Sequence, residues 1–326
     1  MSTASVLVTF STDEERPALE EGLPPGTELR YLEDVPSESR AAAVGAADYV
    51  LTLSPARELS DAEFARLGAD QVLQLVTAGV DHVPFERLPD GMQVASNAGA
   101  YAEPMAEHVL ALYLALSKRL PIEHHHMQQG EFNQFRETHR VDGSVCGIFG
   151  FGAVGEATAR LLKPLGVDVH AVNRRGEADE QTAFLGTPDS LDRLLRRCDG
   201  LVISAPLTPE TRGRIGRDEL ETMTADAFLI NVSRGEIVDQ RALYEHLESN
   251  PAFQAGLESW WVEPVRHGEF TVEYPFLELP NVIGCPHNSA MVPGVRTRGI
   301  RHATANVRGA IESGTLGNVV DRERGY

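Results

Sequence analysis

Residues 145–155 read Val-Cys-Gly-Ile-Phe-Gly-Phe-Gly-Ala-Val-Gly, an apolar run that ends in the pattern Gly150-x-Gly152-x-x-Gly155. We expect the apolar part to form a β-strand and a helix to follow the glycines directly. In that setting Gly150 permits a tight turn, Gly152 lets the backbone approach a pyrophosphate, and Gly155 lets helix and strand pack closely. Free N–H groups at the start of the helix would then face the bound anion. Because another strand is expected at 167–172, the pattern predicts a dinucleotide-binding site.

Short apolar runs alternate with helical patterns along the rest of the chain, which is typical of parallel sheets flanked by helices. In the first part of the chain the expected strands are 6–10, 28–32, 49–53, 71–76 and 93–95, with helices at 14–20, 37–46 and 60–67. Beyond the glycines, strands are expected at 167–172, 201–205, 227–232, 254–257 and 282–283. Long helices are expected near 101–119 and at 293–313. The sequence therefore predicts an α/β protein with two parallel sheets.

The composition is that of a folded chain with room for two domains. Of 326 residues, 42% are hydrophobic, enough for each domain to bury its own core. Lys and Arg total 29 against 48 Asp and Glu, so the formal net charge is −19. Such a surface repels nucleic acid and anionic membranes, and we expect neither as a partner. Only Lys118 and Lys163 are lysines, which fits either a high-salt cytoplasm or GC-rich codon usage.

The cysteines and the apolar runs bear on the cellular compartment. Cys146, Cys198 and Cys285 are odd in number and far apart, which suits reduced thiols. The first apolar run, 6–10, is too short for the core of a signal peptide and is followed by acidic residues. No apolar run approaches the ~20 residues of a membrane span. We therefore expect a soluble, cytoplasmic protein.

The tripeptide Asn173-Arg174-Arg175 follows the second strand of the dinucleotide unit. That strand normally ends in an acidic residue, which hydrogen-bonds the ribose hydroxyls of NAD. Asn173 lacks the charge that would repel a 2′-phosphate, and the guanidinium groups of Arg174 and Arg175 can bind one with paired hydrogen bonds. The sequence thus favours NADP(H) over NAD(H). The alternative is that both arginines are solvated surface residues.

Three polar stretches lie at or just past the ends of expected strands, where a bound dinucleotide should lie. They are Asn231–Asp239, Glu258–Pro264 and Leu279–His287. Taken alone, Arg234 is explained as a surface cation, Glu263 as a solvated loop acid and His287 as an ordinary loop histidine.

Five motifs follow one another in the chain: the glycine turn, Ala205–Gly213, Asn231–Asp239, Glu263-Pro264 and Pro286-His287. In this order they resemble the D-isomer-specific 2-hydroxyacid dehydrogenases, and the resemblance covers essentially the whole chain. It implies a flavodoxin-like substrate domain and a Rossmann dinucleotide-binding domain with an active-site cleft between them. The substrate domain would comprise residues 1–99 and 290–326, and the cofactor domain residues 100–289. A homodimer formed through the cofactor domains is also implied.

The resemblance assigns the catalytic roles to Arg234, Glu263 and His287. Arg234 would hold the carboxylate of a 2-oxo acid and polarise the carbonyl oxygen. His287 would give a proton to that oxygen as general acid and act as base in reverse. Glu263 beside the imidazole would raise the pKa of His287. The backbone at Ala78 and Gly79 matches the family's site for the substrate carboxylate.

The residues expected to bind the cofactor come from the glycine turn, the arginine-bearing loop and the later motifs. They are Gly150, Gly152, Val154, Gly155, Asn173, Arg174, Arg175, Ala205, Pro206, Thr211, Val232, Ser233 and Glu258. No metal is expected, because the successive histidines 124–126 would point in different directions from a helix.

The chain departs from the family pattern at several positions. Glu258 stands where the family has an Asp near the nicotinamide amide. Cys285 stands where a Thr is common, and we expect it to be a packed side chain rather than a nucleophile. Trp260 and Trp261 are bulkier than the usual pair. They are expected either to shape the substrate pocket or to pack at the cleft or dimer surface.

The function expected is that of a cytoplasmic NADPH-preferring reductase for a small 2-oxo acid such as glyoxylate or hydroxypyruvate. One alternative is an NAD-dependent dehydrogenase for D-2-hydroxy acids, including a phosphoglycerate or a branched 2-oxo acid. Another is an NAD(H)-sensing binding protein like the corepressors that share this fold. The absence of long disordered tails in the sequence favours an enzyme.

Overall fold

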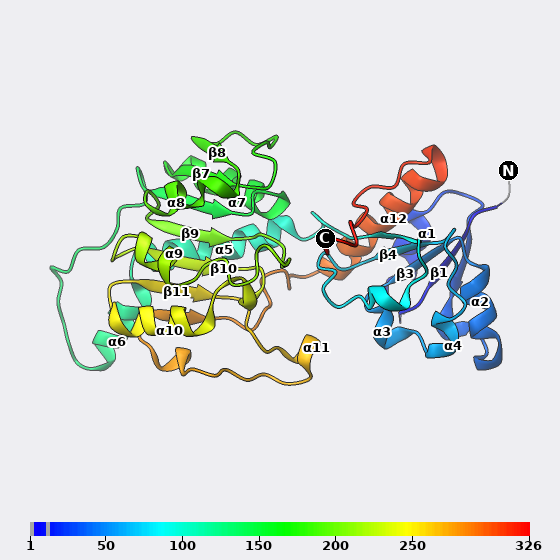
Figure 1. The fold of residues 1–326 in the computed structure, drawn as a ribbon, viewed down its shortest axis with the longest axis horizontal. Coiled ribbons are helices and arrows are strands. Elements are labelled where there is room, and N and C mark those ends of the chain that lie inside the picture. Colours follow the sequence, from blue (N-terminus) through cyan, green and yellow to red (C-terminus); the bar gives the residue numbers. More distant parts are fainter. Residues whose placement is uncertain (1–2, 11–13) are drawn as a thin grey trace. The chain divides into compact units, whose positions relative to one another are not determined.

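The computed structural model describes residues 3–10 and 14–326. The chain forms two compact units, one from the described residues up to Tyr101 with Val292–Tyr326, the other from Ala102–Met291. We call them the first and the second unit. The changeovers lie two residues beyond the domain boundaries expected at 99/100 and 289/290. Figure 1 shows each unit as a sheet covered by helices.

The first unit holds a five-stranded parallel sheet with the order β2-β1-β3-β4-β5. This is the flavodoxin-like order. The strands are β1 (Ser5–Val8), β2 (Glu28–Tyr31), β3 (Tyr49–Thr52), β4 (Val72–Leu75) and β5 (Gln93–Ala95), and the helices are α1 (Arg16–Gly22), α2 (Arg40–Ala46), α3 (Pro55–Glu58), α4 (Asp61–Phe64) and α12 (Val295–Ser313). Helix α12 packs against α1, so the last helix completes the unit that the N-terminal segment begins.

The second unit holds a seven-stranded parallel sheet with the order β12-β11-β10-β9-β6-β7-β8. Its strands are β6 (Val145–Phe149), β7 (Asp168–Val172), β8 (Phe184–Gly186), β9 (Gly200–Ile203), β10 (Phe228–Asn231), β11 (Gln254–Leu257) and β12 (Val282–Gly284). The helices are α5 (Ala102–Ser117), α6 (Leu120–Gln128), α7 (Ala153–Leu162), α8 (Leu191–Leu195), α9 (Arg217–Thr222), α10 (Gln240–Ser249) and α11 (Pro264–His267). Strand β6 comes first in sequence among these strands and lies between β9 and β7, so the strand order reverses there. Ligands of such sheets bind at this point.

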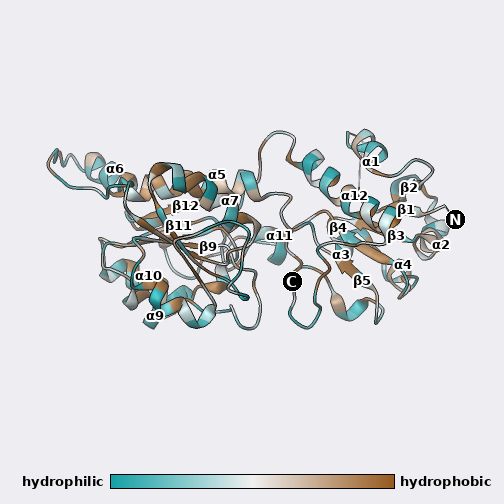
Figure 2. Cartoon of the chain, turned by 90° about the horizontal axis from the view of Figure 1, so that it is seen from above, coloured by the Kyte–Doolittle hydropathy of each residue, from teal (hydrophilic) through white to brown (hydrophobic). Residues whose placement is uncertain are grey.

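Hydrophobic clusters on both faces of the second sheet explain why helices cover it on two sides. One cluster joins α5 and α7 to the strands, for example through Leu112 and Leu162. The other joins α8, α9 and α10, for example through Leu194, Leu220 and Leu243. Figure 2 shows hydrophobic residues concentrated in the strands and hydrophilic residues on the outer helices. The expectation of an α/β protein with two parallel sheets is confirmed.

Two local expectations differ from the structure. The helix expected at 60–67 is short, because α4 ends at Phe64 and a turn follows. Strand β8 was not expected, since it has three residues at the sheet edge and none of them is fully buried. Across the described residues, no helix combines the length and the apolar character needed to cross a membrane.

Candidate active site

The three glycines after β6 have the geometry expected of a dinucleotide turn. Gly150 has φ +99°, and a Cβ there would lie 2.1 Å from the Ala205 nitrogen. A Cβ on Gly155 would lie 2.8 Å from the Gly150 carbonyl oxygen, so α7 packs tightly on the strand. Gly152 precedes α7 and has no atom within 4 Å of its would-be Cβ. The backbone at the start of α7 is therefore open to an approaching phosphate group.

The loop after β7 is organised by Asn173. Its side-chain nitrogen donates to the carbonyl oxygens of Phe151 (3.1 Å) and Glu177 (2.8 Å). Its side-chain oxygen accepts from the N–H groups of Arg175 (3.1 Å) and Gly176 (2.7 Å). Asn173 therefore shapes the loop with all of its polar atoms, and both Arg174 and Arg175 are exposed on it.

The segment after β9 lies directly against the glycine turn. Ser204 Oγ donates to the Gly150 carbonyl (2.7 Å), and Ser233 Oγ donates to the Ala205 carbonyl. Thr211 Oγ1 donates to the carbonyl of the exposed Pro206 (2.7 Å). Two apolar residues expected near the cofactor also lie here: Val154 is partly buried in the first turn of α7, and Val232 is buried after β10. The structure thus gathers these expected residues at one edge of the sheet.

His287 and Glu263 form the central pair of the site. Nδ1 of His287 lies 2.9 and 2.8 Å from the two carboxylate oxygens of Glu263. Glu263 is buried and also accepts from the Trp260 N–H (2.7 Å). His287 has φ +51°, a left-handed conformation that is uncommon outside glycine. Nδ1 is the ring nitrogen that faces Glu263, and 35% of the His287 side chain is exposed.

The pKa values of the pair move in opposite directions. Burial alone would lower the pKa of His287, but the Glu263 hydrogen bond and the charges of Glu258 and Glu263 outweigh it and raise the pKa. Burial alone would raise the pKa of Glu263, but the His287 and Trp260 hydrogen bonds, with the His287 and Arg234 charges, lower it. Both shifts favour an imidazolium–carboxylate pair.

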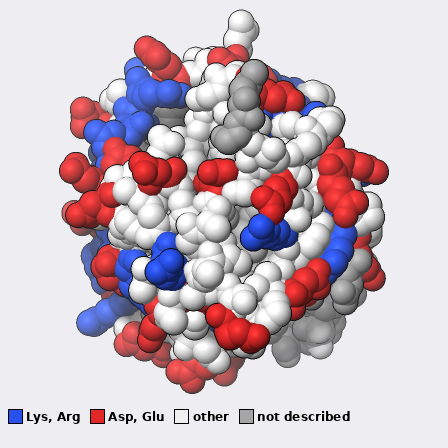
Figure 3. Space-filling view, turned by 90° about the vertical axis from the view of Figure 1, so that its right-hand side faces the viewer, with Lys and Arg blue, Asp and Glu red and all other residues white. Residues whose placement is uncertain are grey.

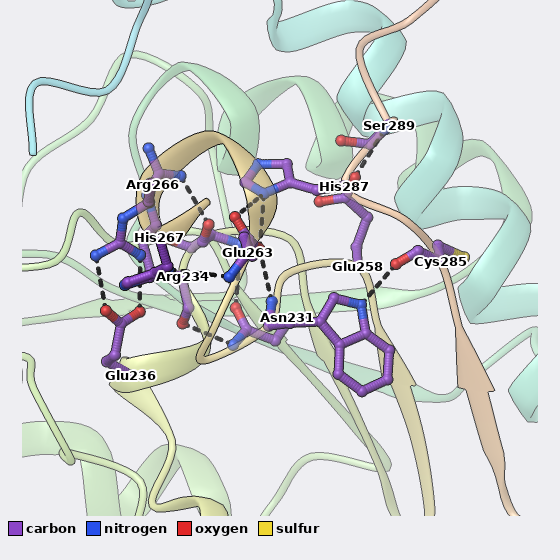
Figure 4. Close-up of polar contacts among 12 residues, drawn as sticks. Asn231, Arg234, Glu236, Glu258, Glu263, Arg266, His267, Cys285, His287 and Ser289 are labelled. Atoms are coloured by element: carbon purple, nitrogen blue, oxygen red, sulfur yellow. Dashed lines mark hydrogen bonds and ion pairs between the residues drawn. The ribbon is translucent and has the colours of Figure 1, made fainter. Parts of the chain in front are cut away.

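Arg234 lies beside this pair at the end of β10. Its charge acts on both Glu263 and His287, and its Nη1 donates to the Ser233 carbonyl (2.8 Å). Buried Asn231 holds the turn, donating to the Arg234 carbonyl (2.9 Å) and accepting from the Ser233 N–H (3.0 Å). The structure therefore brings together the expected trio, which comes from three separate strand ends (Figure 4).

Glu258 is fully buried behind His287. One carboxylate oxygen accepts from the Ser289 N–H (2.7 Å), and the Glu258 carbonyl accepts from the His287 N–H (3.0 Å). The other carboxylate oxygen is buried without a hydrogen-bond partner. An unsatisfied buried acceptor is costly.

The tryptophans and Cys285 pack within the second unit. Trp260 is buried, with Nε1 donating to the Cys285 carbonyl (2.7 Å). Trp261 stacks on Phe276 at 5.3 Å and donates to the Val238 carbonyl (2.8 Å). Burial, followed by the charge of Glu258, raises the pKa of Cys285 and keeps it a thiol.

Ala78 and Gly79 lie in the first unit, which does not contain the trio. They follow β4 in a partly buried loop in which Thr77 Oγ1 donates to the Gly79 carbonyl (3.3 Å). A ring nitrogen of His82 lies 3.0 Å from the Leu53 carbonyl and ties the loop to the end of β3.

Several contributors to the site were not assigned from the sequence. Asn231 begins one of the polar stretches noted in the sequence, but it was given no role of its own there. The backbone N–H of Ser289 carries no sequence signal. Residues 3–10 and 14–326 contain no group of three or more His, Cys, Asp or Glu side chains that could hold a metal ion.

Comparisons with known proteins define the class. The sequence model of the D-isomer specific 2-hydroxyacid dehydrogenase NAD binding domain matches residues 110–289. The chain belongs to this family, and it is an NAD(P)-dependent oxidoreductase acting on small 2-oxo or 2-hydroxy acids.

Individual relatives carry more specific names. The mouse (Mus musculus) "Glyoxylate reductase/hydroxypyruvate reductase" is 31% identical over 237 residues, covering 71% of this chain and 70% of its own. The "D-3-phosphoglycerate dehydrogenase" of Methanocaldococcus jannaschii is 28% identical over 68% of this chain but only 41% of its own.

Two similar solved structures contain NADPH or NADP. A D-isomer specific 2-hydroxyacid dehydrogenase from Xanthobacter autotrophicus Py2, in complex with NADPH and MES, has a TM-score of 0.82 at 26% identity and covers 100% of both chains. The NADPH-dependent glyoxylate/hydroxypyruvate reductase from Sinorhizobium meliloti, in complex with NADP and sulfate, has a TM-score of 0.78 at 26% identity, covering 99% of this chain and 100% of its own.

Proposed function

We propose that this enzyme reduces a small 2-oxo acid, such as glyoxylate or hydroxypyruvate, to the D-2-hydroxy acid with NADPH. The observation that carries the proposal is the His287–Glu263 pair, 2.8 Å apart, within the field of Arg234. His287 supplies a proton donor and Arg234 a cation at the same edge of the sheet. Reduction of a carbonyl beside a carboxylate requires both. The names of the mouse and Sinorhizobium meliloti proteins support this substrate class.

The residues present fit a nicotinamide dinucleotide. The open backbone at Gly152 suits a pyrophosphate, and the partnerless oxygen of Glu258 suits the N–H of a carboxamide. The residues that would hold the cofactor are Gly150, Gly152, Val154, Gly155, Asn173, Arg174, Arg175, Ala205, Pro206, Thr211, Val232, Ser233 and Glu258. When bound, the reduced nicotinamide supplies the two electrons of the reaction.

The protein's own groups provide binding and proton transfer. We assign Arg234 to the substrate carboxylate and carbonyl oxygen, where its planar fork of donors can hold both. Since Nδ1 of His287 is held by Glu263, Nε2 is the nitrogen that gives the proton to the developing alkoxide oxygen. Glu263 stabilises the imidazolium before that transfer. The backbone at Ala78 and Gly79 is proposed to bind the substrate carboxylate as well.

Preference for NADPH follows from the loop after β7. Asn173 is neutral and ties the loop, and Arg174 and Arg175 are exposed beside it. A 2′-phosphate would gain charge-assisted hydrogen bonds there and meet no carboxylate from residue 173.

The proposed assembly is a homodimer formed through the second unit. Phe132 and Phe135, in the loop after α6, are 74% and 84% exposed, and exposed aromatic groups mark association surfaces. Sedimentation analysis of the wild type and of Phe135→Ser tests this, and a monomeric wild type would contradict it.

The cytoplasm is the proposed location, because the cysteines of the described part are free. Acidic side chains spread over the face shown in Figure 3, with basic side chains among them. With the net charge of −19, this supports the expectation that nucleic acid and anionic membranes are not partners.

A panel of 2-oxo acids, tested with NADPH and with NADH by absorbance of the reduced nicotinamide, tests the activity. We expect the highest kcat/KM for a small 2-oxo acid with NADPH. Turnover confined to a phosphoglycerate substrate would favour the alternative named for the Methanocaldococcus jannaschii relative.

A further inference from the structure

An ion pair joins the loop that carries Arg234 to the loop that carries Glu263. Arg266 faces Glu236 fork to fork, with Nη1 3.0 Å from Oε2 and Nη2 2.7 Å from Oε1 (Figure 4). The two side chains are only 17% and 14% exposed. A bidentate, mostly buried pair of this kind has a defined geometry, unlike ordinary surface pairs.

Each partner is a near neighbour of a residue of the proposed catalytic trio. Glu236 lies in the 3₁₀ turn Gly235–Ile237, which begins directly after Arg234. Arg266 lies in α11, whose N-cap residue is Glu263. The two partners are 30 residues apart in sequence, so their contact joins two loops that are not neighbours along the chain.

Helix α11 has no apolar anchor of its own. It spans four residues, none of them buried, and Val265 is exposed. The hydrogen bond from the Glu263 N–H to Nδ1 of His267 (2.9 Å) is internal to the loop. The position of α11 against the Arg234 loop therefore depends on polar contacts such as the Arg266–Glu236 pair.

Close backbone packing defines a second point between the same loops. A Cβ on Gly235 would lie 2.4 Å from the Trp260 carbonyl carbon and 2.6 Å from the Trp261 nitrogen. Together, Gly235 and the ion pair hold the loops on either side of the Arg234 and Glu263 side chains.

We propose that Arg266 and Glu236 are positioning residues that hold Arg234 and Glu263 in register for the reaction. The inference rests on the proposed function for its effect on turnover, and on the geometry of the loops for its effect on His287.

The pKa of His287 reports the position of the Glu263 loop, because three charged groups face this histidine. They are Glu263 from the loop before α11, Glu258 from the end of β11 and Arg234 from the end of β10. Removing Arg266 leaves all three in the chain and releases the loop that carries Glu263. The hydrogen bond that raises the pKa of His287 then weakens, and that pKa falls toward its ordinary value.

The experiment compares the wild type with Arg266→Met, Arg266→Lys and Arg241→Met in the full-length protein. Arg241→Met is the matched control, because it breaks an Arg–Glu pair on α10 (2.6 Å to Glu245) that does not join the two loops. Two readouts are used: kcat and KM for the best 2-oxo acid, and the pKa of His287 by NMR titration of isotope-labelled histidine. Arg266 is changed before Glu236, because Glu236 also lies 3.9 Å from Arg212 and its replacement would disturb a second ion pair.

We expect Arg266→Met to lower kcat by about 10- to 100-fold, the loss typical of misplaced catalytic groups. The pKa of His287 should fall in this variant and recover in part in Arg266→Lys, while Arg241→Met behaves as the wild type. An unchanged His287 pKa in Arg266→Met, or an equal loss in Arg241→Met, overturns the proposal.

The two readouts separate this proposal from the proposed function. A wild type inactive on every 2-oxo acid refutes the function, whereas the His287 titration still decides the positioning role. If Arg266→Met does not fold, Glu236→Gln removes the charge at nearly constant size. Its His287 pKa must also fall, and an unchanged value overturns the proposal.

Discussion

Nδ1 of His287 lies 2.8 Å from a carboxylate oxygen of Glu263, although 24 residues separate the two in sequence. This contact occupies Nδ1, so the other ring nitrogen of His287 does not face the carboxylate. The negative charge of Glu263 favours the protonated form of His287.

Glu263→Gln should shift the pH dependence of the reaction. Reduction requires protonated His287, so its rate falls as pH rises through the raised pKa of that residue. Without the Glu263 charge the pKa falls, and the descending limb of kcat/KM moves to lower pH. In the oxidative direction the ascending limb moves the same way. Identical pH profiles for wild type and variant would remove Glu263 from this role.

His287→Ala should lower kcat by about 10²- to 10⁴-fold, the range for a lost general acid. Dissociation constants for NADPH, measured by fluorescence, should stay close to the wild-type values, because the glycine turn is untouched. Arg234→Ala provides the contrast, since loss of the carboxylate contact should raise KM as well as lower kcat. A His287→Ala enzyme with near-normal turnover would refute the assignment.

Replacing Arg174 and Arg175 together by Ala should weaken NADPH selectively. Loss of charge-assisted hydrogen bonds to a 2′-phosphate is expected to raise the KM for NADPH by roughly 10-fold or more. The KM for NADH should change little, because NADH has no such phosphate. Equal effects on both cofactors would show that the two arginines are only surface residues.

Gly150→Ala and Gly152→Ala form a matched pair with different outcomes. At Gly150 φ is +99° and the new Cβ would lie 2.1 Å from backbone, so the variant should lose stability severely, by about 3 kcal/mol or more. At Gly152 the Cβ meets no atom within 4 Å, so the variant should fold normally and bind dinucleotide less well. Thermal unfolding and cofactor titration measure the two effects. A stable Gly150→Ala protein would contradict the account of the turn.

Local patterns in the sequence predicted most of the fold. Continuous apolar runs predict buried parallel strands, and nearly all those expected are present, including β5 and β11 at their expected bounds. Strand β8 was missed because three partly buried residues give no periodic signal. The glycine spacing predicted its own turn, since φ +99° at Gly150 is a local requirement that few other residues meet.

Interactions between segments that are distant in sequence could not be predicted from such local patterns. Asn173 was expected beside the cofactor, but its polar atoms are all used in shaping the loop. The sequence left open whether Trp260 shapes the substrate pocket or packs at the cleft or dimer surface, and it carried no sign of the hydrogen bond from its Nε1 to the Cys285 carbonyl. The Glu236–Arg266 pair had no sequence signal, since each residue alone is an ordinary loop charge.

Residue order and spacing thus determined the class of fold and the dinucleotide turn, because these follow from backbone preferences and short-range spacing. The proposed trio came from the order of the motifs and the family that they resemble. The partner of each polar group depended on the folded sheet. Hydrogen bonds and ion pairs act over about 3 Å, and strand ends that are tens of residues apart reach that distance only after β10, β11 and β12 have paired.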